Sequence, residues 1–280
     1  LVGSEMCIRD SNLTNEQYNY YKNRDKLNLV LPSIAVDAII LARKNNELYM
    51  LLQEYDEPFI LDEVYNLIEL GLIGSFIQTG LSFKDNLNQI VYQKTGLDIS
   101  NDYKKQIAIY DNPNRDNRDH IITTSYIVFT DYKEVNNCMW VKIDNDNIKN
   151  NHHVYINFEE QYFDDDFPFY PYITLNKKEV DDDQSFDYKL KFDNYQGHST
   201  MIYDAITYLH ETLFTKGDLL RVYTNGFTTT EAWKLIENFY DQSFSRTNIR
   251  RKILNISEDT HTTKLENTTH SKIYKIKEDL

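Results

Sequence analysis

The stretch that most constrains the fold of this chain is residues 244–254, with the sequence FSRTNIRRKIL. Ser245 is expected to cap a helix, and Ile249 and Ile253 then share one face of it because they are four residues apart. The other faces carry side chains suited to phosphate groups and base edges. We predict that this set contacts DNA: Ser245, Arg246, Thr247, Asn248, Arg250, Arg251 and Lys252. A surface helix with solvated arginines is the alternative.

The neighbouring segments favour the first interpretation, because together they predict a winged helix–turn–helix. Residues 227–240 carry apolar side chains at helical spacing, and residues 241–243 link this helix tightly to the next. Residues 264–266 and 270–277 predict two short strands around a loop, as in a wing. The wing adds three candidate DNA contacts, Lys264, His270 and Lys272.

The distribution of charge is compatible with this interpretation. The 280 residues suffice for two domains, and their formal net charge of −14, taken as a whole, argues against nucleic-acid binding. Residues 227–280, however, carry nine Lys and Arg against eight Asp and Glu, a net charge of +1, so the acidity lies in residues 1–226. Four cations cluster within residues 246–252, and a dimer would double them.

Cysteine usage and hydropathy predict a cytoplasmic protein without a membrane anchor. Only Cys7 and Cys138 occur, too few for a disulfide framework or a four-cysteine metal site. No apolar run reaches the roughly 18 residues of a membrane span, and no signal peptide is evident. Residues 1–11 differ in composition from the Asn-, Tyr- and Lys-rich residues that follow. We therefore interpret 1–11 as a non-native leader and 12–30 as an N-terminal segment.

Residues 31–213 alternate between strand and helix patterns. Apolar, β-branched runs predict strands at 33–41, 47–53, 106–110, 121–129 and 139–143, with a turn at Asn45 and Asn46 between the first two. A glycine-containing segment at 72–77 precedes a helix over 82–97. We expect Ser82 and Asp85 to cap this helix and Gly96 to end it. Its predicted buried stripe is Phe83, Leu87, Ile90 and Val91.

This order of elements resembles a Nudix domain, whose signature runs from a glycine through a helix rich in metal-binding glutamates to a second glycine. Gly74 and Gly96 fit the two ends. Where the signature has Arg-Glu-x-x-Glu-Glu, this chain has residues 89–94, QIVYQK, and the earlier glutamate falls at Gly80. Mg²⁺ needs clustered carboxylate oxygens, and Lys94 would repel it. We therefore expect a protein that is not an enzyme, with no catalytic residue, metal or required cofactor.

Further motifs are similar to those of Nudix-related transcriptional regulators, bacterial repressors of NAD and sugar metabolism. Residues 110–126 resemble the family's Pro-x-Arg-Asp-x-Arg-x-His loop and strand. Residues 192–198, 248–252 and 270–274 resemble its Phe-Asp-His, Asn-Phe-Arg-Arg-Lys and wing segments, so the likeness spans about 31–277. The resemblance implies an effector site made by Arg115, Asp116, Arg118, His120 and Gly74.

The fold implied is α+β: a Nudix-like α/β/α sandwich with a mixed sheet, then a C-terminal winged helix–turn–helix domain. We place the ligand-sensing domain at 31–213, an extended linker at 214–226 and the DNA-binding domain at 227–280. The implied function is a homodimeric repressor of a double-stranded DNA operator that senses ADP-ribose or a related nucleotide. The chain departs from the family by an insert at about 146–188 and by Ile73, where proline is usual.

Several alternatives remain open at this point. The arginines of the effector loop could instead form salt bridges with Asp111, Asp116 and Asp119, and residues 199–213 predict a helix that packs on the sheet or forms a dimer seam. In the insert, the aspartate runs are solvated loops or cation sites, and His152–His153 could ligate a metal. A residual nucleotide-diphosphate hydrolase would use Glu69, Asp85, Glu159 and Glu160. A Nudix-fold interaction module without DNA binding is the other alternative.

Overall fold

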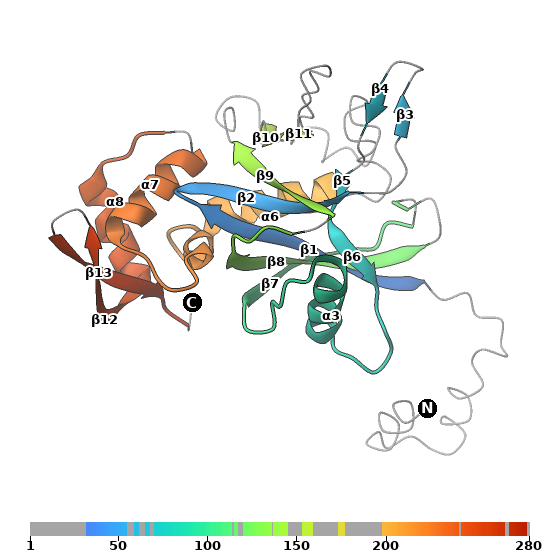
Figure 1. Ribbon diagram of the computed structural model, residues 1–280, viewed down its shortest axis with the longest axis horizontal. Coiled ribbons are helices and arrows are strands. Elements are labelled where there is room, and N and C mark those ends of the chain that lie inside the picture. The colour runs from blue at the N-terminus through green and yellow to red at the C-terminus, as the bar shows by residue number, and fades with distance from the viewer. Residues whose placement is uncertain are drawn as a thin grey trace.

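The computed structural model of the protein (Figure 1) describes residues 32–54, 59–61, 65–67, 70–113, 115–116, 120–135, 137–144, 153–158, 173–176, 198–240, 242–266 and 269–278. Several predictions lie outside these residues: the leader and N-terminal segment, the effector residue Arg118, the carboxylates of Glu69, Glu159 and Glu160, His152, and the aspartate runs of the insert. No helix of the described part is long and apolar enough to cross a membrane.

A mixed sheet of nine strands forms the centre of the molecule. Strand β1 (Ser33–Lys44) pairs antiparallel with β2 (Glu47–Glu54) through a turn at Asn45, whose φ is 61°, and parallel with β8 (Ile121–Asp131). The sheet order is β11-β10-β9-β2-β1-β8-β7, with β5 beside β2 and β6 beside β1. The remaining strands are β5 (Leu70–Gly71), β6 (Ile73–Phe76), β7 (Tyr103–Tyr110), β9 (Cys138–Asp144), β10 (His153–Phe158) and β11 (Ile173–Asn176).

The structure therefore contains each strand that the apolar pattern predicts, and it adds others. β10 and β11 lie within the predicted insert and extend the sheet beyond β9. A separate hairpin, β3 (Phe59–Leu61) with β4 (Tyr65–Leu67), lies before β5. These added strands are short, and each pairs with a strand that neighbours it in chain order.

Helix α3 (Phe83–Thr95) covers one face of the sheet (Figure 1). The Ser82 hydroxyl oxygen accepts from the Asp85 N–H at 3.2 Å, and Gly96 ends the helix at a φ of 74°, as predicted. Leu87, Ile90 and Val91 are buried, but the prediction for Phe83 is wrong because its side chain is 39% exposed. The buried position belongs to Asn86, which binds the preceding loop through the N–H and the carbonyl of Gln78.

Helix α6 (His198–Thr212) covers the opposite face, so the α/β/α sandwich with a mixed sheet is confirmed. Alternate residues of β1 divide between the two faces, as the period of a strand requires: Ile39 and Leu41 pack towards α6, whereas Ala38 and Ile40 pack towards α3. The apolar side of α6 is buried within this same chain together with Leu213, which follows the helix. This is the packing alternative rather than a dimer seam. The buried residues of α6 are Met201, Ile202, Ala205, Ile206 and Leu209.

The segment predicted as an extended linker is instead a buried part of the core. It contains the 3₁₀ helix η3 (Asp218–Val222), in which Leu219, Leu220 and Val222 are buried together with Tyr223 next to it. These residues belong to a hydrophobic cluster that also includes residues of β1, α6 and the C-terminal helices. The pattern of two leucines, a valine and a tyrosine was the signal for this burial, but it is too short to show helical periodicity.

The C-terminal unit, residues 227–278, is a helix–turn–helix followed by a hairpin, as predicted. Its helices are α7 (Thr229–Tyr240) and α8 (Arg246–Ile256), and its strands are β12 (Ser257–Glu266) and β13 (Thr269–Ile276). Thr228 and Glu231 cap α7 reciprocally, through N–H to side-chain bonds of 2.9 and 3.2 Å. Ser245 does occupy the N-cap of α8, but its hydroxyl makes no cap hydrogen bond, so that part of the prediction is wrong.

Candidate effector pocket and nucleic-acid interface

A polar cavity of about 160 Å³ opens between the start of β1, β6, α3 and the loop before β8. It brings together three of the predicted effector residues, Gly74, Arg115 and Asp116. His120 is not among its lining residues. The His120 carbonyl oxygen accepts from the Ser33 N–H at 3.0 Å, and its Nε2 lies 3.1 Å from the Asp111 carbonyl oxygen, so His120 ties the loop to β1. We call this cavity the effector pocket.

Gly74 is required in the effector pocket by the side chain opposite it. The pairing of β1 with β6 places Asp37 across from Gly74. A Cβ atom added to Gly74 would lie 1.6 Å from Asp37 Oδ1 and 2.8 Å from the Val36 carbonyl oxygen. The absence of a side chain therefore lets a buried carboxylate, 7% exposed, lie over the strand.

Arg115 lies at the wall of the effector pocket, and two oxygen atoms of β8 accept hydrogen bonds from it. Its Nη2 donates to the Thr123 side chain at 2.7 Å and to the Ile121 carbonyl oxygen at 3.1 Å, both at the start of β8. Its neighbour Asp116 is buried. These bonds orient a guanidinium group in a cavity, the geometry by which arginine binds paired oxyanions.

Four further polar residues converge here that the sequence motifs did not assign to the site: Lys94, Gln53, Asp37 and His198. The Lys94 ammonium donates to the Gly74 carbonyl oxygen at 2.6 Å and to Gln53 Oε1 at 3.0 Å. Partial burial lowers the pKa of Lys94, and the nearby Asp37 carboxylate opposes that shift. His198, at the start of α6, accepts from the Leu72 N–H at 3.2 Å, and its Nε2 is 3.9 Å from Asp37 Oδ1.

The one sequence signal for this cluster was Asp37, a charged residue inside an otherwise apolar strand. In the part of the chain that the structure describes, no group of three or more His, Cys, Asp or Glu side chains is placed to hold a metal ion. The carboxylate of Asp85 accepts from the Ser82 hydroxyl at 2.6 Å, so this hydrolase candidate serves the helix cap.

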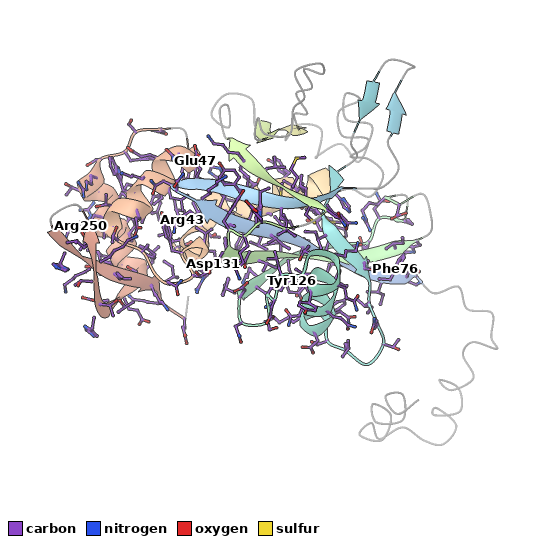
Figure 2. All side chains as sticks on the ribbon, viewed as in Figure 1. Arg43, Glu47, Phe76, Tyr126, Asp131 and Arg250 are labelled. Atoms are coloured by element: carbon purple, nitrogen blue, oxygen red, sulfur yellow. The ribbon has the colours of Figure 1, made fainter. Side chains whose placement is uncertain are left out.

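Helix α8 presents its cationic residues outward while its apolar residues enter the core. Ile249 and Ile253 are buried, at 3% and 0% exposure, as the spacing of four residues predicts. The candidate DNA contacts from 245 to 248 and from 250 to 252 are all exposed. Figure 2 shows Arg250 at the outer end of the C-terminal unit, far from Phe76 at the rim of the effector pocket.

The exposed cations differ in how firmly they are held. The Arg246 guanidinium donates to Thr230 Oγ1 at 2.6 Å and lies 5.7 Å from the Trp233 ring centroid, whereas the Lys252 ammonium lies 4.2 Å from the Phe214 ring centroid. Within the described residues, no hydrogen bond or ion pair engages Arg250 or Arg251. These two arginines are therefore the cations of α8 best placed to bind an external partner.

The wing places its predicted contacts on the surface, but acidic residues neutralise two of them. Lys264 forms an ion pair of 2.6 Å with Glu231, and Lys272 forms one of 2.6 Å with Asp259. His270 is exposed, with its Nδ1 3.5 Å from Thr263 Oγ1. Lys264 and Lys272 must each break an ion pair before they can contact phosphate. Each should therefore contribute less to DNA binding than Arg250 or Arg251.

A polar cluster joins the sheet to the C-terminal unit, and we call it the joint. The buried Asp218 carboxylate accepts from Tyr208 of α6 at 2.5 Å and from Arg221 Nε at 2.9 Å. The Arg221 guanidinium lies 4.0 Å from the ring centroid of Tyr103 of β7, and its Nη2 donates to the Lys277 carbonyl oxygen at 3.1 Å, just after β13. The joint therefore links four separate parts of the chain.

Helix α6 also contacts α7 through His210. The imidazole stacks on Phe239 with ring centroids 4.3 Å apart and meets Tyr240 edge-on at 4.5 Å. Its Nε2 is buried and has no hydrogen-bond partner among the residues described. Burial without a partner disfavours the charged imidazolium and lowers the pKa of His210 to about 4.

We expect this histidine to make the protein less stable in acid. Because the folded state binds the proton more weakly than the unfolded chain, the free energy of unfolding is unaffected above about pH 6.5 and falls as the pH is lowered towards 4. The loss between about pH 6.5 and 5 is about 1.5 kcal/mol. Urea unfolding of His210→Phe, which cannot titrate, should lack this loss. Equal slopes for both proteins would contradict the assignment.

Solved structures share this arrangement. A MutT/nudix family protein from Enterococcus faecalis matches with a TM-score of 0.69 and 20% identity, over 95% of this chain and 100% of that one. NrtR from Shewanella oneidensis, complexed with a 27mer DNA, matches with a TM-score of 0.57 and 17% identity, over 88% of this chain and 94% of that one. The chain has a Nudix-related fold.

NrtR solved without DNA matches in the same way, with a TM-score of 0.55 and 18% identity, over 89% of this chain and 95% of that one. These likenesses extend over both the Nudix-like domain and the C-terminal unit, which confirms the fold that the sequence motifs predict. No protein-family model and no curated protein matches the sequence.

Proposed function

We propose that this protein is a DNA-binding transcriptional regulator whose Nudix-like domain senses a nucleotide. The observation that carries the proposal is the outer face of α8, where Arg250 and Arg251 are exposed and unengaged by the described residues while Ile249 and Ile253 root the helix in the core. A helix that buries an apolar face in the core and exposes a cationic face to solvent is suited to the major groove. The likeness to NrtR, solved with a 27mer DNA, supports this assignment.

The effector pocket supplies the sensing site of this proposal. It presents the cations Arg115 and Lys94 around Gly74, and the resemblance of the Arg115 loop to the regulators suggests ADP-ribose or a related nucleotide as the ligand. We propose that catalysis is lost, since Lys94 stands where the Nudix signature has a metal-binding glutamate and an ammonium group cannot be a metal ligand. The protein would bind its operator as a homodimer and act as a repressor.

Helix α6 offers a physical connection between the two sites. His198 at its start lies beside Asp37 in the effector pocket, and His210 near its end packs on α7. A ligand releases DNA only if it binds the released conformation more tightly. Because the core is continuous from the sheet into the C-terminal unit, a shift of α6 would be transmitted to α7 and α8 by direct contact. The spacing of two recognition helices in a dimer would then change.

DNA binding tests the proposal directly. Fluorescence anisotropy should show that the purified full chain binds its own upstream intergenic DNA in preference to an unrelated duplex. Raising the salt from about 50 to about 200 mM should weaken the binding at least tenfold, because bound phosphates release counterions. ADP-ribose should weaken the specific binding further.

Each failure has its own meaning. Binding that is indifferent to ADP-ribose would keep the DNA-binding role and require another effector. An absence of binding even at low salt would contradict the regulator and favour the other hypothesis, a Nudix-fold interaction module without DNA binding. Release of nucleoside monophosphate from ADP-ribose in the presence of Mg²⁺ would instead establish the residual hydrolase.

A further inference from the structure

The effector pocket has its own fixed cation. We infer that the Lys94 ammonium takes the part of a divalent metal ion and binds the diphosphate group of a nucleotide directly, with Arg115 as the second cation. The inference rests on the proposed function, because it names the group by which the effector is held. It predicts a ligand site that works without metal.

The surroundings of the Lys94 ammonium are those of a bound cation. Its Nζ lies 2.6 Å from the Gly74 carbonyl oxygen and 3.0 Å from the Gln53 amide oxygen. Burial lowers the pKa of Lys94, and the Asp37 carboxylate opposes this shift by favouring the charged form. Carbonyl, amide and carboxylate oxygens are also the ligands that Mg²⁺ prefers. A metal ion entering among the same oxygens would be repelled by the ammonium, so one site does not hold both.

Three elements of the fold place this ammonium in the effector pocket. Lys94 lies in the last turn of α3, where a cation is favoured by the unpaired helix carbonyls. Gly74 lies on β6 and Gln53 on β2, and both strands pair antiparallel with β1. An ammonium group has three N–H donors, and the hydrogen bonds to Gly74 and Gln53 use two of them. The third donor can serve a ligand oxygen without loss of either contact.

Arg115 provides the second half of the diphosphate site. Its guanidinium is fixed by the Thr123 side chain and the Ile121 carbonyl oxygen and lines the same cavity as Lys94. A lysine acts on phosphate as a point charge, whereas an arginine binds two oxygens in a defined plane. Together they match two linked phosphates. Because Asp37 and Asp116 also line the cavity, its formal charge is balanced, and affinity has to come from these directed bonds.

The size of the cavity agrees with a diphosphate rather than a whole nucleotide. Its volume of about 160 Å³ is below the roughly 300–1,000 Å³ of sites that enclose drug-sized ligands. The rest of the ligand would therefore lie across the rim, where Phe76 is 47% exposed and offers an aromatic face. Figure 2 shows Phe76 at this end of the sheet.

Calorimetric titration of the full chain with inorganic pyrophosphate and with ADP-ribose, first in EDTA and then in Mg²⁺, tests the inference. We expect the wild-type protein to bind both ligands in EDTA, with Kd values that change less than about threefold when Mg²⁺ is added. Lys94→Met should weaken both at least about tenfold, since it removes a charge-assisted hydrogen bond. Lys94→Arg should retain most of the affinity. Lys84→Met, which removes an exposed lysine from the same helix, is the matched control.

Three results would overturn the inference. The first is wild-type binding that requires Mg²⁺, and the second is no binding of either ligand. The third is unchanged affinity in a Lys94→Met protein whose thermal unfolding matches the wild type. A further variant, Lys94→Glu, places a carboxylate beside Gly74, and its binding should become dependent on Mg²⁺. DNA binding measured without ligand remains a separate readout, so loss of the metal-free site and failure of the proposed regulator are distinguishable.

Discussion

Replacing Arg250 and Arg251 together by alanine should weaken specific DNA binding at least about 100-fold. A good arginine contact in the groove contributes about 1–3 kcal/mol, and the two losses occur in each protomer of a dimer. Both side chains are exposed, whereas Ile249 and Ile253 hold the helix in the core, so the variant should unfold like the wild type. Anisotropy on the upstream DNA, with urea unfolding of both proteins, measures the two effects separately.

The matched control removes the same charge elsewhere. Lys84→Ala/Lys133→Ala takes two exposed lysines from the Nudix-like domain, and its DNA affinity should stay within about threefold of the wild type. If both double variants weakened binding equally, net charge rather than α8 would account for the affinity. The loss in Arg250→Ala/Arg251→Ala should also reduce the salt dependence of binding if these arginines contact phosphates.

Removing the Asp218 carboxylate should cost the most stability of any single change at the joint. Asp218→Ala leaves Arg221, whose side chain is 13% exposed, without its ion pair and Tyr208 without its acceptor. Breaking a buried pair by removing one partner destabilises by about 3–5 kcal/mol, because the remaining charge is desolvated and uncompensated. The urea midpoint, read at constant m-value, measures this loss.

A surface ion pair of the same chemistry provides the control. Asp259 and Lys272 of the wing are 2.6 Å apart, and the Lys272 side chain is 64% exposed. Asp259→Ala should therefore lower the urea midpoint much less than Asp218→Ala does, because solvent screens an exposed pair. If the two substitutions lowered it equally, the joint would not be a buried electrostatic link. Because the joint connects α6 to the end of the wing, Asp218→Ala should also weaken the response of DNA binding to ADP-ribose while DNA binding itself persists.

The candidate site was only partly predictable from the sequence, and the missing part is informative. Gly74, Arg115 and Asp116 were predicted by resemblance, and they do line one cavity. In the sequence, Lys94 is notable only because it replaces a metal-binding glutamate of the signature. The motif gives no role for a lysine at this position. Its contacts with Gly74 and Gln53 depend on how α3 lies against β6 and β2, which no local pattern reports.

The sequence by itself determined the local elements of this protein. The apolar run of β1, the cap at Ser82, the end at Gly96, and the four-residue spacing of Ile249 and Ile253 depend on neighbours within one helical turn or along one strand. Such signals are complete within a short window of sequence. They also predicted the order of the elements, and from that order the fold class.

Only the tertiary structure decided how these elements combine into sites. It buried η3 where an extended linker was expected, since Leu219 and Leu220 find apolar partners on the sheet and on the C-terminal helices. It also gathered Asp37, Lys94 and His198, from three separate elements, around Gly74. Both outcomes depend on contacts between residues far apart in the chain, whose free energy comes from packing and from polar groups that find partners on burial.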